Sequence, residues 1–311
     1  MWRASKAPTA AKMIGILCDA LNTHAHLPKQ CDIASIGPLH MAALYDEFGP
    51  DQLFADDVYC GMDLDKDIAI LKALVECSER LAFHGGVLKG DPNCMTERSD
   101  GIAAYPIISG EIEKARQAAR ANAHAEALER YVWSTWWDDP TIRFSVEDAA
   151  ATNSKNVRGL MAAIGELTAL ESWYEIRPAF SAEGLEVAIV FAKLASGGVI
   201  SGGAAGRKGD ETVRLRALGE LARHAAGVEK LKAGAKAGSF YEKRLAYMAT
   251  AAAGNSLQER LRQNGEREIV LLPLAIDAKI DHSLRDFVCV HRCLFANQPP
   301  FVGGALERLC L

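Results

Sequence analysis

Apolar residues recur along much of the chain with the spacing of an amphipathic helix. The segment Asp67–Phe83 carries its apolar residues on one face, as the 3.6-residue period of a helix requires. Asp63 or Asp65 precedes it and can accept hydrogen bonds from the unpaired N–H groups of its first turn. The same period predicts helices over Ala10–Leu21, from near Glu111 (with Ser109 as cap) to about Ser134, over 149–170 with an interruption near 153–156, over Glu211 to about Ala225, and over Phe240–Ala253.

Other segments have the composition of strands. Leu185–Leu194 is rich in Val, Ile and Phe and almost continuously apolar, which is typical of a buried strand. Ser99–Tyr105 is rich in small residues and is predicted to be a loop or strand of the kind that lets the backbone approach a ligand. Further strands are predicted over Cys31–Gly37, Val58–Gly61, Trp173–Phe180, Glu268–Ile276 and Ser283–Phe295, the last with a helical start.

Glycines connect two of these segments and help to define the fold class. Val199–Gly206 is interpreted as a glycine-rich connection, and its spacing fits neither the dinucleotide-binding fingerprint nor the P-loop. Helices and strands mix without strict alternation. The sequence therefore predicts an α+β (mixed α/β) fold, with helices packed around one mixed β-sheet in a single domain.

Composition narrows the class of function. The chain has 311 residues, of which 49% are hydrophobic and 24% charged, and a net charge of −5. These are ordinary globular values, and the acidic balance argues against nucleic acid as a partner. The chain contains no apolar run of membrane-spanning length and no clear signal peptide. We therefore expect a cytoplasmic protein with no membrane partner.

The spacing of the eight cysteines is not that of a disulfide framework, and no C-x-x-C is present. Cys289, His291 and Cys293 alternate with apolar residues. This pattern favours a buried strand with free thiols over a zinc site.

The candidate chemistry begins with a pair of like charges. Glu126 and Glu129 are three residues apart, so they share a helix face, and Arg130 follows at once. Such a pair costs a few tenths of a kcal/mol unless a cation offsets it. Taken alone it is compatible with a solvated surface or with a divalent cation. A di-iron site is disfavoured because such sites use Glu-x-x-His, which neither glutamate-rich helix supplies.

The motif occurs twice, and this favours the cation site. Ala-x-x-Glu-x-x-Glu-Arg spans residues 73–80 and again residues 123–130. Two copies on separate amphipathic helices can bring four carboxylates to one cation. Arg216 and Glu220 lie four residues apart on a third helix, where they suffice only for a surface ion pair.

Three motifs in this order resemble those of the YcaO family of ATP-dependent enzymes that modify peptide backbones. Glu76–Arg80 is similar to the family's S-x-x-x-E-x-x-E-R helix. Ser99–Ala104 and Glu126–Arg130 are similar to its S-N-G-x-A loop and E-x-x-E-R helix. Gly202–Ala205 followed by Arg216–Glu220 is similar to its R-A-L-x-E helix. The likeness divides the chain into an N-terminal extension, residues 1–30, and a YcaO-like ATP-binding catalytic domain, residues 31–311.

The resemblance implies a set of site residues and two cofactors, ATP and Mg²⁺. Arg130 and Arg216 would be catalytic and would contact the ATP phosphates, and Ser99 would also contact the nucleotide. In the family, a backbone amide oxygen attacks the γ-phosphate of ATP, and phosphate leaves after a nucleophile adds to the amide carbon. The implied Mg²⁺ ligands are Glu76, Glu79, Glu126, Glu129 and Glu220.

Two positions depart from the family pattern. Lys72 stands where the first motif has serine, and Ala118 stands where the second helix begins with a glutamate. Glu111 or Glu113 is a substitute for that glutamate only if the start of the helix is rearranged.

The chain end also departs from the azoline-forming members, which often carry a Pro-x-Pro-x-Pro tail. We therefore expect thioamide formation in a peptide or protein substrate, with a TfuA-like partner that helps to deliver sulfur. Azoline formation and a non-catalytic, peptide-binding role are the alternatives. A homo-oligomeric assembly is also expected.

Overall fold

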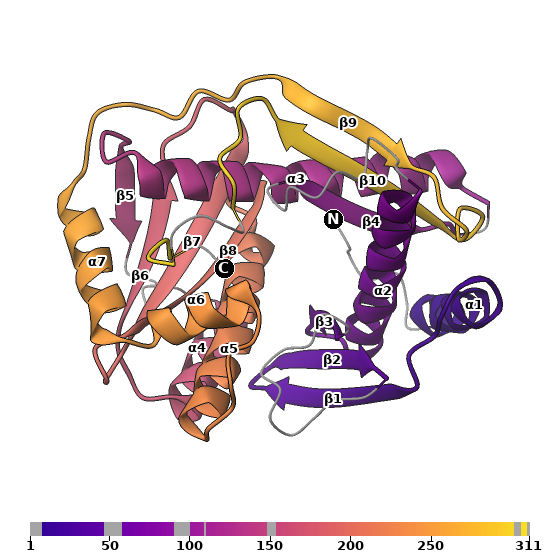
Figure 1. The fold of residues 1–311 in the computed structure, drawn as a ribbon, viewed down its shortest axis with the longest axis horizontal. Coiled ribbons are helices and arrows are strands. Elements are labelled where there is room, and N and C mark those ends of the chain that lie inside the picture. The colour runs from indigo at the N-terminus through magenta and orange to yellow at the C-terminus, as the bar shows by residue number, and fades with distance from the viewer. Residues whose placement is uncertain are drawn as a thin grey trace.

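The computed structural model describes residues 8–46, 58–89, 100–108, 110–147, 154–301 and 306–309 (Figure 1). Its helices are α1 Pro8–His24, α2 Lys66–Leu88, α3 Ile112–Asp138, α4 Lys155–Leu167, α5 Glu211–Lys232, α6 Phe240–Met248 and α7 Ala251–Arg262. Its strands are β1 Gln30–Ile36, β2 Leu39–Tyr45, β3 Tyr59–Asp63, β4 Gly101–Pro106, β5 Phe144–Glu147, β6 Leu170–Pro178, β7 Leu185–Leu194, β8 Val199–Arg207, β9 Leu274–Ile280 and β10 Val288–Phe295.

The strands form three antiparallel sheets, so the predicted α+β class is confirmed. The orders are β1-β2-β3, β4-β10-β9 and β5-β6-β7-β8. The expected single mixed sheet is not what the described residues form. The prediction of one sheet is wrong because sequence patterns identify strands but not their partners. Strand β4 pairs with β10, near the other end of the chain, and Gly101 lies opposite Cys293.

The long helix α3 joins two of these sheets (Figure 1). It packs on β4 and β10 at one end and on β7 and β8 at the other. Its buried face toward β4 and β10 is made of small residues, Ala115, Ala119 and Ala123. Because alanine side chains are short, the helix backbone can lie close to the sheet.

Three helices press directly on strand glycines. A Cβ atom added to Gly61 would lie 2.0 Å from the Ala69 carbonyl oxygen of α2. At Gly101 the carbonyl oxygen of Ala123 in α3 would be 1.9 Å away, and at Gly202 that of Ala217 in α5 would be 2.1 Å away. Only glycine allows so close an approach, so these glycines set the distance between each strand and its helix.

Two large apolar cores lie on the two sides of the molecule. One packs β7 and β8 against α3, α4 and α5, and Trp133 and Trp136 are fully buried in it. The other contains residues of α1, α2 and β2, so the described part of the N-terminal extension packs on the body of the protein. Among the described residues, no helix combines the length and hydrophobicity that a membrane span requires.

Most predicted helices are confirmed. Asp65, one of the two candidate caps, accepts hydrogen bonds from the backbone of Asp67 at 2.9 Å and of Ile68 at 3.2 Å at the start of α2. Ser109, the expected cap of α3, lies outside the described residues, and at Glu111 no side chain caps the helix. Helix α5 runs beyond its predicted end at Ala225, to Lys232.

Three predictions are wrong in detail. The segment interpreted as a glycine-rich connection is strand β8, whose glycines serve close packing rather than a turn. The helix predicted over Phe240–Ala253 is two helices, α6 and α7. The break between them packs closely on Gly198, where an added Cβ would lie 2.4 Å from the Ala249 carbonyl oxygen. The strand predicted from Glu268 begins only at Leu274, directly after Pro273, which has no N–H to donate to a sheet.

Candidate functional site

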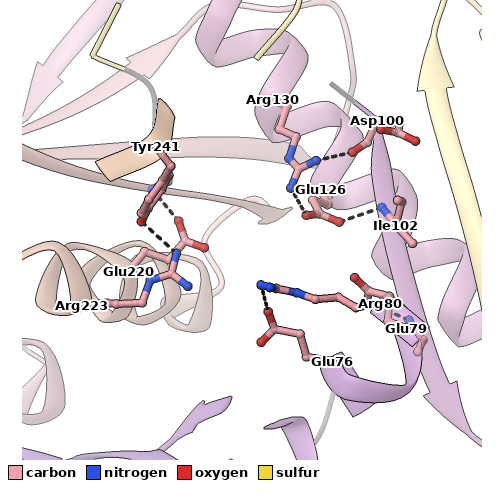
Figure 2. Close-up of polar contacts among 12 residues, drawn as sticks. Glu76, Glu79, Arg80, Asp100, Ile102, Glu126, Arg130, Glu220, Arg223 and Tyr241 are labelled. Atoms are coloured by element: carbon pink, nitrogen blue, oxygen red, sulfur yellow. Dashed lines mark hydrogen bonds and ion pairs between the residues drawn. The ribbon is translucent and has the colours of Figure 1, made fainter. Parts of the chain in front are cut away.

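The five predicted glutamates come from α2, α3 and α5. Glu76, Glu79, Glu126 and Glu220 lie around one space (Figure 2), and Glu129 is close enough to Glu220 and Glu126 for their charges to add to the rise that burial causes in its pKa. Figure 2 shows side chains of all three helices turned toward a common space, with Arg80, Arg130 and Glu220 on different sides of it. The two copies of the motif, Glu76–Arg80 and Glu126–Arg130, therefore face one site, as their repetition predicts.

On each helix, one glutamate is anchored to the strand whose glycine the helix contacts. Glu76 accepts a hydrogen bond from the Cys60 backbone N–H at 2.8 Å, and Glu126 accepts one from Ile102 at 2.8 Å. Glu220 accepts one from Gly203 at 3.5 Å. Each donor is adjacent to a glycine on which the helix rests. Carboxylates held by backbone N–H groups lose little freedom when a ligand binds, so the site is preorganised.

Arginines pair with two of these carboxylates one helical turn away. Arg80 forms an ion pair with Glu76, and Arg130 forms one with Glu126. Arg130 also donates to the Asp100 carbonyl oxygen, which connects α3 to the segment before β4. The Asp100 carboxylate is itself fully buried and paired with Arg292 of β10.

The remaining two glutamates, Glu79 and Glu129, are buried next to like charges, although Glu79 accepts a hydrogen bond from the Ala104 backbone N–H at 3.2 Å. Burial, followed by the charges of Glu126 and Glu76, raises the pKa of Glu79 well above its ordinary value. Burial and then Glu220 do the same for the pKa of Glu129, whose side chain is 7% exposed. Burial also raises the pKa values of Glu126 and Glu220. Such a group gains free energy by taking up a proton or a metal cation.

The donor set fits a hard divalent cation, because it consists of carboxylate oxygens alone. Among the described residues, no three of the five glutamates have donor atoms within 4.8 Å of one another. Mg²⁺ is typically held by one or two carboxylates together with substrate phosphates and water. The spread of the glutamates therefore suits cations that share their coordination with a phosphate group.

The two arginines predicted to contact phosphate occupy different environments. Arg130 lies within the site, as described above. Arg216 is exposed on α5, where it donates to the Ala205 carbonyl oxygen at 3.2 Å. Burial raises the pKa values of Glu129 and Glu220, and the charge of Arg216 offsets part of that rise, so Arg216 belongs to the same electrostatic group. Ser99, the third predicted nucleotide contact, lies outside the described residues.

Lys72, the first departure from the family pattern, has a structural place. It follows the contact residue Ala69 by three positions, just as Glu126 follows Ala123 and Glu220 follows Ala217. Lys72 donates from Nζ to the Met62 carbonyl oxygen at 2.9 Å and to Asp63 at 2.6 Å. On α2 an ammonium group thus holds the strand where α3 and α5 use a carboxylate.

For the second departure, Ala118, neither of the two candidate glutamates is a substitute. Glu111 and Glu113 are exposed at the start of α3 and pair with Lys114 and Arg116. Because a helix rises 1.5 Å per residue, Glu113 lies about 20 Å from Glu126 along the axis. Neither glutamate can reach the site from this position.

Sequence reasoning missed two members of the site. Arg223 on α5 donates to the Tyr241 hydroxyl at 3.4 Å, and its charge offsets part of the rise that burial causes in the pKa of Glu220. The spacing Glu220-x-x-Arg223 was a usable signal, since both copies of the other motif also pair glutamate with a following arginine. Tyr241 comes from α6, and nothing in its sequence surroundings indicates this contact.

Comparisons with known proteins place the fold. No family model matches the chain, and no curated protein matches it. The fold is of the α+β class, with a carboxylate-rich site between three helices. Among solved structures it is similar to YcaO from Methanopyrus kandleri, which was solved with AMPPCP and Mg²⁺. The TM-score is 0.61 at 13% sequence identity, and the match covers 94% of this chain and 92% of that chain. The YcaO-like fold that the motifs predict is thereby confirmed.

Proposed function

We propose that this protein is an ATP- and Mg²⁺-dependent enzyme that phosphorylates a backbone amide oxygen of a peptide or protein. The observation that carries the proposal is the convergence of glutamates and arginines from three helices at one site of a YcaO-like fold (Figure 2), with Glu129 in the same group of interacting charges. The similar structure from Methanopyrus kandleri contains an ATP analogue and Mg²⁺, which supports the same ligands here.

The acidic residues would bind the metal and the basic residues the phosphates. Glu76, Glu79, Glu126, Glu129 and Glu220 would hold Mg²⁺, which neutralises charge on the triphosphate. Arg130 and Arg216 would donate hydrogen bonds to phosphate oxygens, since a guanidinium matches them in geometry and charge. The strand N–H groups of Cys60, Ile102 and Gly203 keep the carboxylates in place. The chain thus acts by positioning and charge stabilisation, as in phosphoryl transfer generally.

We further propose a thioamide as the product, formed with a TfuA-like partner that delivers sulfur. The amide oxygen takes the γ-phosphoryl group and ADP leaves; hydrosulfide then adds to the amide carbon and phosphate departs with the original oxygen. Cyclodehydration to an azoline is the alternative, and it needs the same activated amide. Mass spectrometry of a co-expressed peptide distinguishes them, because oxygen-to-sulfur exchange raises the mass and loss of water lowers it.

A non-catalytic, peptide-binding role is the second candidate, and the lysine at 72 and the alanine at 118 favour it. Titration with Mg-ATP tests both candidates. Binding coupled to ADP release and peptide modification supports the enzyme. Binding without turnover in the presence of peptide and partner supports the second role, and absence of binding contradicts the enzyme.

A further inference from the structure

A second group of ligand-type side chains lies away from the carboxylate site, on the sheet that packs against α3. Asp277 of β9 faces Cys293 of β10 directly across the sheet, and His291 is two residues before Cys293 on the same strand. The Asp277 Oδ1 lies 3.3 Å from Nδ1 of His291 and 3.7 Å from Sγ of Cys293. One donor atom from each residue lies within 4.8 Å of the others.

These separations are those of a coordination sphere. Zinc binds sulfur at about 2.3 Å and nitrogen or oxygen at about 2.0–2.2 Å in tetrahedral geometry, which puts neighbouring donor atoms about 3.5 Å apart. The two separations from Asp277 lie on either side of that value. Among the described residues, this is the one group of three such side chains that meets the distance criterion.

A buried nitrogen without a hydrogen bond points into the group. His291 is 6% exposed, and its Nδ1 makes no hydrogen bond in the described structure despite its proximity to Asp277. Burying a polar atom without a partner costs about 1–3 kcal/mol. A metal ion bonded to Nδ1 would remove that cost. Cys293 is fully buried, whereas Asp277 is partly exposed and leaves a route from solvent.

Arg120 is the cation that now faces this group. It extends from α3 and pairs with Oδ2 of Asp277, while Oδ1 stays directed at His291 and Cys293. The Arg120 side chain is 61% exposed, so it can remain on Oδ2 or move into solvent when an ion binds. The positive charge of Arg120, which would repel a bound cation, can therefore move away from the group.

We propose that Asp277, His291 and Cys293 bind a zinc-class divalent ion. Sulfur, imidazole nitrogen and carboxylate oxygen together suit zinc or cobalt, whereas Mg²⁺ prefers oxygen alone. Three protein ligands leave a fourth position for water or another ligand. The ion joins β9 to β10, the strand that packs against α3, the helix that carries Glu126 and Glu129 (Figure 1). A C-x-H-x-C pattern would suggest Cys289 as the third ligand, but in the structure Asp277 takes that place. The proposal does not depend on the proposed function.

Cobalt(II) titration of the purified full chain tests the proposal. A thiolate bound to Co²⁺ gives a charge-transfer absorption band in the near ultraviolet, which carboxylate ligands alone do not give. We expect this band to saturate at one equivalent with an excess of Mg²⁺ present, to be lost in Cys293→Ser, and to weaken in Asp277→Asn. Zinc should displace the cobalt and abolish the band.

Cys289→Ser is the matched control, because Cys289 is buried on the same strand and outside the group. The band should persist in it. A band that survives Cys293→Ser but disappears in Cys60→Ser would place the thiolate near Glu76 and overturn the proposal, as would a wild-type protein that gives no band. If Cys293→Ser fails to fold, Asp277→Asn decides, since an unchanged band and affinity in that variant also overturn the proposal. Mg-ATP titration of each folded variant shows separately whether the nucleotide site is intact.

Discussion

Glu129 illustrates how one side chain can be unfavourable for folding and useful for function. It is 7% exposed, lies next to Glu220, and has a raised pKa because burial and that neighbour both oppose its charge. A residue chosen for stability alone would not be ionisable here. The proposed binding of a cation would explain why an ionisable residue is present at this buried position.

Glu129→Gln should therefore stabilise the ligand-free protein and abolish activity. The amide keeps the shape and removes the repulsion, so we expect a gain on the order of 1 kcal/mol in the free energy of unfolding. ADP release should fall by at least a hundredfold, because a charge contact to the metal–nucleotide is lost. Chemical denaturation and an ADP assay measure the two effects. Glu113→Gln, exposed on the same helix, should change neither.

The pH dependence of that stability gain has a definite sign. The folded pKa of Glu129 is raised, so the folded protein binds its proton more tightly than the unfolded chain does. Ionisation then destabilises the fold as the pH rises from the ordinary glutamate range through the raised pKa. The stability advantage of Glu129→Gln should be greatest at high pH and should vanish at low pH. Unfolding curves of both proteins over a pH series measure it, and an advantage independent of pH would contradict this account.

The helices of the site were the part that the sequence could predict well. Helices α2, α3 and α5 combine a regular apolar face with glutamates at fixed spacing, and this pattern is local. The pairing of β4 with β10 is not local, and β8 was misinterpreted because its glycines resemble a turn. Tyr241 was missed for the same reason, since its contact with Arg223 joins two helices that no pattern relates.

The glycines under these helices give a direct test of the packing. In Gly101→Ala the new Cβ would lie 1.9 Å from the Ala123 carbonyl oxygen, so α3 must move away from β4. We expect a loss of about 2–3 kcal/mol in unfolding free energy and a weaker site. Gly165→Ala, in α4, meets nothing within 4 Å and should instead add up to about 1 kcal/mol. Urea denaturation of both variants measures the difference, and equal effects would refute the close-packing argument.

Each of the three sheets packs against one of the helices that carry the site glutamates. In the described structure, no strand pairing connects the three sheets β1-β2-β3, β4-β10-β9 and β5-β6-β7-β8. Helix α3 contacts two of these sheets, and the glutamates of α2, α3 and α5 meet between them. A ligand bound to all three helices would therefore connect parts of the fold that otherwise depend on helix packing.

Mg-ATP should accordingly stabilise the protein as a unit and slow exchange at particular amides. At a concentration one hundred times the dissociation constant, binding adds about 2.7 kcal/mol to the free energy of unfolding. The N–H groups of Cys60, Ile102 and Gly203 donate to site glutamates from three different strands, so their hydrogen exchange reports on each helix separately. All three should slow together in the wild type, and none should slow in Glu129→Gln if that residue is needed for the metal. Protection confined to one strand would mean that the nucleotide contacts a single helix, and the shared site would then be wrong.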